Sequence, residues 1–298
     1  MTKSGETLQQ AASESVKGRS LWQDAGRRLV KNRAAVVSAV ILGLLVLLVI
    51  FGPMLSPHDY YTQDYDAIWQ PPTLSDGHLL GTDSIGRDLF VRTLAGGRIS
   101  LMIGLVATLV SLIIGVAYGA IAGYFGGKVD TVMMRLVDIL YAMPFLFFVI
   151  LLMVFFGRQI FLIFIAIGAI NWLDMARIVR GQTLSLKNKE FVEAARMAGA
   201  SSASVIRRHI VPNLLGVVAV YVTLTIPQVI LFESFLSFLG LGVQEPATSW
   251  GSLVKEGADE MSRAPWLLVY PALALAVTLF CFNFIGDGLR DALDPKDR

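Results

Sequence analysis

The feature that most constrains this chain is a set of long runs without charged residues. The run from Ala34 to Leu55 holds no Lys, Arg, Asp or Glu. Its ~22 residues, at ~1.5 Å each in a helix, reach across a hydrocarbon layer of ~30 Å. Over the whole chain 55% of the residues are hydrophobic, only 16% are charged, and the mean hydropathy is +0.63. We therefore expect an all-α membrane protein that crosses the bilayer several times.

Six segments of this kind are expected to span the membrane. The fourth is the least continuous: its apolar run ends at Ile170, and the span is extended through Asp174 so that the number of crossings stays even. Within the second span, Gly115, Gly119 and Gly123 recur every four residues, a spacing that lets another helix approach closely. The expected spans cover residues 34–55, 99–125, 139–157, 160–176, 214–240 and 264–285.

The basic residues are distributed unevenly between the connecting segments. Of 25 Lys and Arg, 19 fall in the N-terminal tail, a turn segment at 124–135, the segment 174–213 and the C-terminal tail, and six fall in the alternate loops. Basic residues accumulate on the cytoplasmic side of membrane proteins. Both termini are therefore expected in the cytoplasm, and the protein in a bacterial inner membrane.

The polar N-terminal tail, residues 1–33, carries seven of the Lys and Arg residues. Within it, Ser20 to Arg33 has the pattern of an amphipathic helix on the membrane surface, with Ser20 as its N-cap and Trp22 on its apolar side. A merely solvated basic tail is an equally open interpretation.

The sequence lacks the motifs that would bind nucleotide, hydrolyse a bond or hold a metal. The single Gly-Lys pair, at 127–128, is not preceded by the first glycine of a phosphate-binding loop. Neither H-E-x-x-H nor G-x-S-x-G occurs, the three histidines (His58, His78 and His209) are scattered over loops, and Cys281 is the only cysteine. We expect no enzyme activity, and neither a cofactor nor a metal on this chain.

One ionisable residue lies clearly inside an expected span. Glu233 follows Pro227, which loosens the helix backbone, by six residues. A carboxylate at membrane depth is costly and often belongs to a transport mechanism, so Glu233 is a candidate for the substrate pathway. In an ion-coupled secondary transporter it would be the coupling group. An interfacial carboxylate, or one paired within a subunit contact, is the alternative.

The polar segment 177–213 between two spans is unusually long and organised. Gly199 is placed to end a first short helix, and Ser201 or Ser202 to cap a second one before Pro212. Two short helices at a fixed angle can transmit a movement. Four residues at i, i+3, i+4 and i+7 spacing are expected to form a small, nearly flat surface on the first helix: Phe191, Ala194, Ala195 and Ala198.

Within this segment, the stretch from Lys189 to Asn213 resembles the cytoplasmic "EAA" loop of ABC-importer permeases. That loop reads E-A-A, three residues, G, nine residues, I-x-L-P; here His209 and Val211 replace the isoleucine and the leucine. The H-I-V-P-N form is typical of peptide-type permeases. The matching residues are Glu193, Ala194, Ala195, Gly199 and Pro212.

Two further stretches are similar to the same family. The loop before the second span reads GTDSIGRD, and the chain ends with GDGLRDALDPK before its last two residues. The loop can serve to orient the chain or to contact substrate, and its sequence does not separate the two. Together these features resemble the C-type permease subunits of bacterial oligopeptide ABC importers. The loop motif comprises Gly81, Thr82, Asp83, Gly86, Arg87 and Asp88.

This resemblance implies the type I importer fold for a six-span permease domain over residues 34–298, with 177–213 as the coupling loop to an ATPase. It implies import of oligopeptides from periplasm to cytoplasm by alternating access. The implied partners are a homologous second permease subunit, two cytoplasmic ATPase subunits that bind ATP-Mg, and a periplasmic or surface peptide-binding protein. Membrane lipid surrounds the chain, and no nucleic acid is expected.

Three alternatives stay open at this point. The same architecture can serve dipeptides, nickel or another small solute, because specificity need not lie on this chain. An ion-coupled secondary transporter would use Glu233 and would ignore ATP. A membrane scaffold without a transport role would bind no ATPase.

Overall fold

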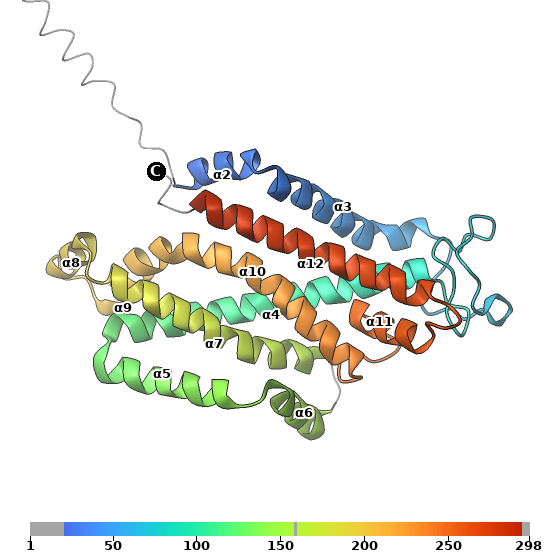
Figure 1. The fold of residues 1–298 in the computed structure, drawn as a ribbon. Coiled ribbons are helices and arrows are strands. Elements are labelled where there is room, and N and C mark those ends of the chain that lie inside the picture. Colours follow the sequence, from blue (N-terminus) through green and yellow to red (C-terminus); the bar gives the residue numbers. More distant parts are fainter. Residues whose placement is uncertain (1–20, 158–159, 294–298) are drawn as a thin grey trace, which may run out of the picture.

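The computed structural model describes residues 21–157 and 160–293, and these residues are helices joined by loops, with one isolated bridge between Thr82 and Asp88. Figure 1 shows long helices side by side in one bundle, with α8 and α9 at one end and the loop between α3 and α4 at the other. The helical elements are α2 (Leu21–Lys31), α3 (Arg33–Leu55), η1 (Tyr65–Ala67), α4 (Leu89–Phe125), α5 (Gly127–Ala142), α6 (Phe145–Phe156), α7 (Ile160–Leu186), α8 (Glu190–Met197), α9 (Ser202–Val205), η2 (Ile206–Ile210), α10 (Val211–Phe238), α11 (Trp250–Asp259) and α12 (Trp266–Leu293).

The all-α membrane fold expected from the sequence is confirmed. Among the described residues, four helices are long and apolar enough to cross a membrane: α3, α4, the continuous helix Ser202–Phe238, and α12. The bent pair α5 and α6 makes a fifth if it counts as one span. The span expected at 160–176 lies within α7, which is not among these helices. The count of six spans is therefore not confirmed and stays a prediction.

The span expected at 139–157 has a different form in the structure. The chain bends by 87° between α5 and α6. Pro144 explains the break, because proline excludes the helical conformation at the preceding residue; Met143 is extended, with φ −75° and ψ 131°. The turn segment expected at 124–135 is mostly helical, and only Gly126, with φ 65°, separates α4 from α5.

α4 begins at Leu89, well before the expected start at residue 99. Asp88 is its N-cap, since the Oδ1 atom of Asp88 accepts a hydrogen bond of 2.9 Å from the backbone N–H of Val91. Arg92 then lies in the first turn of α4, where acidic side chains pair with it. The sequence assigned this turn to a loop because of its charge.

The glycines of α4 let α7 lie directly against it. A Cβ atom added at Gly115 would come within 2.6 Å of the Cβ of Met175, and one added at Gly123 within 2.7 Å of the Cβ of Thr183. Gly119 is blocked in the same way by α7 backbone. The close approach expected from the four-residue spacing is confirmed, and the partner helix is α7.

α2 is the helix expected in the N-terminal tail. Ala25 is buried, whereas Trp22 is 50% exposed. The helix reaches α12, because a Cβ atom added at Gly288 would come within 3.2 Å of the Cδ1 of Leu29. Ser20, the expected N-cap, lies outside the described residues, and placement of α2 on a membrane surface stays a prediction.

Candidate coupling segment and ion-pair cluster

α8 has one buried and one exposed side. Val192 is fully buried and belongs to an apolar cluster with Val205 and Ile210. Ala195 is partly buried against the same cluster. The amphipathic pattern thus packs one side of α8 on the bundle and leaves most of the other side exposed to solvent. The exposed residues of the motif and of the expected flat surface are Phe191, Glu193, Ala194 and Ala198.

Gly199 ends α8, as the sequence predicts, in a Schellman motif. Its backbone N–H donates to the carbonyl of Arg196 at 2.9 Å, and the N–H of Ala200 donates to the carbonyl of Ala195 at 3.0 Å. The φ of Gly199 is 81°, and a Cβ atom added there would meet open space. The positive φ, and not crowding, is therefore what favours glycine at this position.

The second helix of the segment continues into α10 without a break. Ser201 is the N-cap of α9, since its Oγ accepts a hydrogen bond of 3.3 Å from the N–H of Ser204. From there α9, η2 and α10 form a single helix, Ser202–Phe238. A displacement of α9 therefore moves α10 as one body.

Pro212 lies in the first turn of α10, inside this continuous helix and not before a new one as expected. The turn before it, η2, is π-helical, which leaves room for a proline that lacks an N–H and would clash within regular α-helix. His209 belongs to this wider turn, and its carbonyl accepts a hydrogen bond of 2.6 Å from the side chain of Asn213. The departure from regular helix thus has a local cause.

Two basic residues, one in α7 and one directly after it, tie the other end of the segment to α4 and α5. The guanidinium of Arg180 pairs with both carboxylate oxygens of Asp130, with 2.6 Å between Nη2 and Oδ2. The Nζ of Lys187 donates to the carbonyl of Gly123 at 3.0 Å. The segment is therefore held at both ends, by α7 before it and by α10 after it.

At the opposite end of the bundle, the GTDSIGRD motif forms a closed turn. A Cβ atom added at Gly86, where φ is 78°, would overlap the carbonyl of Asp64. The hydroxyl of Thr82 donates to the carbonyl of Ala67 and accepts from the N–H of Gln70 at 2.8 Å. All six motif residues are buried: Gly81, Thr82, Asp83, Gly86, Arg87 and Asp88.

Asp83 is the centre of an ion-pair cluster formed with Arg87, Arg92, Glu245 and Glu256. The Oδ2 of Asp83 accepts from the Nε of Arg87 and from the Nη1 of Arg92, both at 2.6 Å. Arg92 also reaches Glu256 at 2.7 Å, and Arg87 reaches Glu245 at 2.9 Å. The cluster therefore pins the loop before α4 to α11 and to the segment that precedes α11.

Burial alone would lower the pKa of Arg87. The hydrogen bond to Glu245 and the negative charge of Asp83 outweigh this effect, and the pKa of the guanidinium lies above its ordinary value. Arg87 is therefore charged at any pH at which the protein folds.

Glu233 is fully buried among serines between α4 and α10. Its carboxylate accepts from the Oγ of Ser100 at 3.0 Å and from the Oγ of Ser237 at 2.6 Å. The backbone N–H of Trp250 donates to the same Ser100 Oγ at 3.2 Å. In this state the carboxylate is paired inside the chain and joins three helices, and its role in a substrate pathway stays a prediction.

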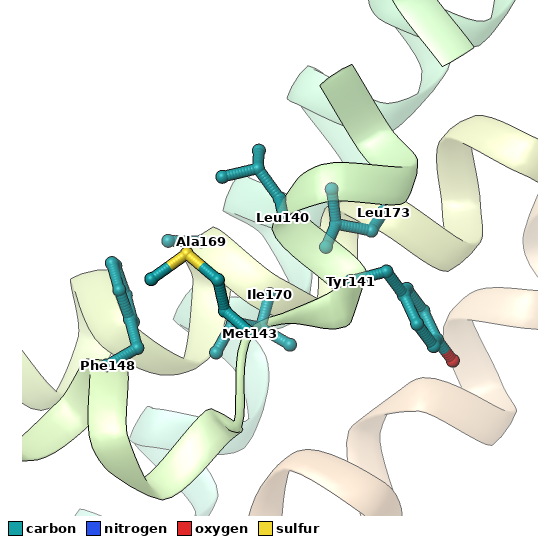
Figure 2. A pocket seen from close by; sticks show the side chains of 7 residues that line it. All are labelled: Leu140, Tyr141, Met143, Phe148, Ala169, Ile170 and Leu173. Carbon is teal, nitrogen blue, oxygen red and sulfur yellow. The ribbon is translucent and has the colours of Figure 1, made fainter. Parts of the chain in front are cut away.

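A cavity of about 260 Å³ lies at the bend between α5 and α6 (Figure 2). Its wall is mostly apolar, and the guanidinium of Arg177 lies 4.4 Å from the ring centre of Tyr141 in that wall. This cavity was not predicted from the sequence, although Pro144 within an apolar run indicates a break in the helix there. The lining residues are Leu140, Tyr141, Met143, Phe148, Ala169, Ile170 and Leu173.

A bundle of long apolar helices, an exposed pair of short helices anchored in it, and a buried ion-pair cluster at its other end are together the features of a membrane-embedded transport permease subunit. The family model described as the inner membrane component of binding-protein-dependent transport systems matches residues 115–298. A second model, described as the N-terminal transmembrane domain of oligopeptide transport permease C, matches residues 20–72. The chain belongs to the family of inner membrane components of binding-protein-dependent transport systems.

Named relatives agree with this assignment. The oligopeptide transport system permease protein OppC of Escherichia coli (strain K12) is 61% identical over 297 residues, 99% of this chain and 98% of the relative. The protein of the same name from Haemophilus influenzae is 59% identical over 283 residues, 95% of this chain and 91% of the relative. The one from Bacillus subtilis is 48% identical over 284 residues, 95% of this chain and 92% of the relative. The resemblance identified from the loop motifs is confirmed.

A solved structure shows the same fold. An inward-facing form of the MetNI methionine ABC transporter superposes with a TM-score of 0.55 at 19% identity, and the match covers 69% of this chain and 96% of that chain. At this identity the likeness concerns the fold alone. The type I importer fold implied by the sequence is thereby confirmed.

Proposed function

We propose that the chain forms, with a homologous second permease subunit, the membrane pathway of an importer for oligopeptides. The support is the identity of 48–61% to oligopeptide permease proteins over at least 95% of the chain. In this proposal a peptide-binding protein delivers the substrate from the periplasm, and two cytoplasmic ATPase subunits bind ATP-Mg. Dipeptides are the nearest alternative substrate, because a dipeptide transport permease of Bacillus subtilis is 47% identical.

The coupling step rests on the exposed side of α8. Phe191 and the small side chains beside it offer a shallow surface that fits a groove on an ATPase subunit. Because α9 to α10 is one helix, closure of the ATPases on ATP displaces α8 and α9 and carries α10 with them. Both chain termini and this segment lie in the cytoplasm in this arrangement.

Glu233 connects that displacement to the middle of the bundle. It lies on α10, and its hydrogen bond to Ser100 crosses to α4. A movement of α10 relative to α4 breaks this bond and exposes the carboxylate between the two helices. While α4 and α10 are packed together, Glu233 links them by its hydrogen bond to Ser100. It faces the substrate pathway only when the two helices separate.

The coupling proposal is tested by Glu193→Lys and Gly199→Leu in the complete transporter reconstituted into proteoliposomes. Both positions are exposed, so the variants should insert and assemble. Leu at position 199 also strains the left-handed backbone that ends α8, so Glu193→Lys is the variant that tests docking alone. Peptide uptake should fall at least about tenfold, the effect of losing ~1.4 kcal/mol of docking free energy, while ATP hydrolysis continues. Uptake and hydrolysis are measured on the same preparation.

The controls introduce the same two residue types at exposed positions of α2, as Gln23→Lys and Gly26→Leu. Both positions are exposed, and a Cβ atom added at Gly26 meets open space. Uptake should be unchanged in these controls. Normal uptake by both coupling-segment variants would refute the proposed role of α8.

A further inference from the structure

Two histidines that the sequence places on separate stretches meet in the structure. His58 follows α3 closely, and His78 lies in the loop before α4. Their rings stack with 4.3 Å between centroids and an angle of 21° between planes. The description of the histidines as scattered is therefore wrong for this pair, because the long loop folds back over the end of α3.

A carboxylate completes the group. The Nδ1 of His78 lies 2.9 Å from the Oδ2 of Asp88, and both side chains are buried. The other oxygen of Asp88 accepts the N-cap hydrogen bond from Val91, which fixes the direction of the carboxylate. One ligand atom from each of His58, His78 and Asp88 lies within 4.8 Å of the other two.

One nitrogen of the His58 ring has an unused capacity for a hydrogen bond or a metal ligand. Its Nε2 is buried and has no hydrogen-bond partner in the part of the chain that the structure describes. Leaving a buried polar atom unpaired is energetically unfavourable. The neighbouring residue is Gly77, with φ 79°, where an added Cβ atom would lie only 3.1 Å from this nitrogen. Glycine therefore keeps the space beside the Nε2 of His58 open.

We propose that His58, His78 and Asp88 bind a zinc ion. Two imidazoles and one carboxylate are a ligand set that Zn²⁺ prefers and that Mg²⁺ and Ca²⁺ do not. With metal–ligand bonds of about 2.0–2.2 Å, tetrahedral ligand atoms lie ~3.4 Å apart. An imidazole holds a metal in the plane of its ring, so one of the two stacked rings turns out of the stack when both bind the ion. The backbone N–H of Val91 is the outer contact that orients the carboxylate.

The position of the site indicates what the ion does. His58 also lines a cavity of about 740 Å³ together with Asp59 and Tyr60. The ion ties the loop just after α3, through His58, to the N-cap of α4, Asp88, and so fixes one wall of this cavity. This inference does not depend on the transported substrate.

The test is metal binding by the full chain, purified in detergent and stripped with a chelator. Isothermal titration calorimetry with Zn²⁺ as the only added metal should show one site per chain. His58→Ala and Asp88→Asn should each weaken binding at least about tenfold. Asn is itself a good N-cap, so the second change removes the anionic ligand and keeps the start of α4. The controls His209→Ala and Asp66→Asn should bind as the unchanged chain does.

A second variant separates ligation from general damage to the fold. His58→Cys should retain Co²⁺ binding and add a thiolate-to-cobalt charge-transfer band that the unchanged chain lacks. Absence of saturable binding below about 10 µM Zn²⁺ would overturn the proposal. So would equal binding by the unchanged chain and the His58 and Asp88 variants, or a His58→Cys protein without the new band.

Discussion

The two ends of the bundle each carry a motif with a glycine at positive φ, but the motif residues are buried at one end and exposed or partly exposed at the other. All six residues of the GTDSIGRD motif named above are buried. At the other end, none of the six residues assigned to ATPase coupling is buried: Glu193, Ala194, Ala195, Gly199, His209 and Pro212.

This difference indicates where the partners of each motif are. The charges of Asp83 and Arg87 are satisfied inside the chain, by hydrogen bonds that close the loop onto α11 and its neighbours. The sequence left open whether this motif orients the chain or contacts substrate, and its buried contacts favour orientation. The exposed residues of the α8 motif, Glu193 and Ala194, have no ion pair or side-chain hydrogen bond within the described residues, which agrees with the proposal that this side docks on another subunit.

The largest expected effect follows from removing the centre of the ion-pair cluster. Asp83→Ala leaves Arg87 and Arg92 buried and each short of a carboxylate, and should lower the free energy of unfolding by ~3–5 kcal/mol. Thermal unfolding in detergent measures the loss. Asp66→Ala, on an exposed acidic residue of η1, should change stability by less than ~0.5 kcal/mol. Equal losses in the two variants would show that the cluster is not what holds this end together.

The next largest effect is the difference in stability loss when Gly86 and Gly199 are each replaced by Ala. Gly86 and Gly199 have nearly the same φ, 78° and 81°. Ala at position 199 has only the strain of a left-handed backbone, ~1–2 kcal/mol. Ala at position 86 adds the overlap with the Asp64 carbonyl, for a total of ~2–4 kcal/mol. The same unfolding measurement on Gly86→Ala and Gly199→Ala tests the difference, and similar losses would mean that the turn at Gly86 relaxes freely.

The features that could be predicted are those determined by residues close together in the sequence. Gly199 and Ser201 end and begin helices as their residue types indicate, and the glycine spacing of α4 gives its close contact with α7. Pro144 was visible as a disruption, but the bend of 87° depends on how α5 and α6 pack, which no local pattern records. The start of α4 was missed because hydropathy does not show that Arg92 is neutralised.

The contacts that were not predictable join residues far apart in the chain. Arg92 and Glu256 are 164 positions apart, and the sequence around either residue does not indicate that the two form an ion pair. The contact between His58 and His78 depends in the same way on a loop that folds back on itself. Local patterns therefore predicted the helix ends at Gly199 and Ser201, whereas they could not predict the ion-pair cluster, whose members are far apart in the chain.

The smallest expected effect concerns the edge of the cluster. The side chain of Glu245 is 67% exposed, so its ion pair with Arg87 is screened by water and salt. Glu245→Gln should lower the free energy of unfolding by no more than ~0.5 kcal/mol, and the loss should vanish at high salt, because Arg87 keeps its buried bond to Asp83. A loss as large as that of Asp83→Ala would place the anchor of this end at residue 245. Both ends of the bundle would then depend on exposed residues, and the contrast between the buried cluster and the exposed α8 would disappear.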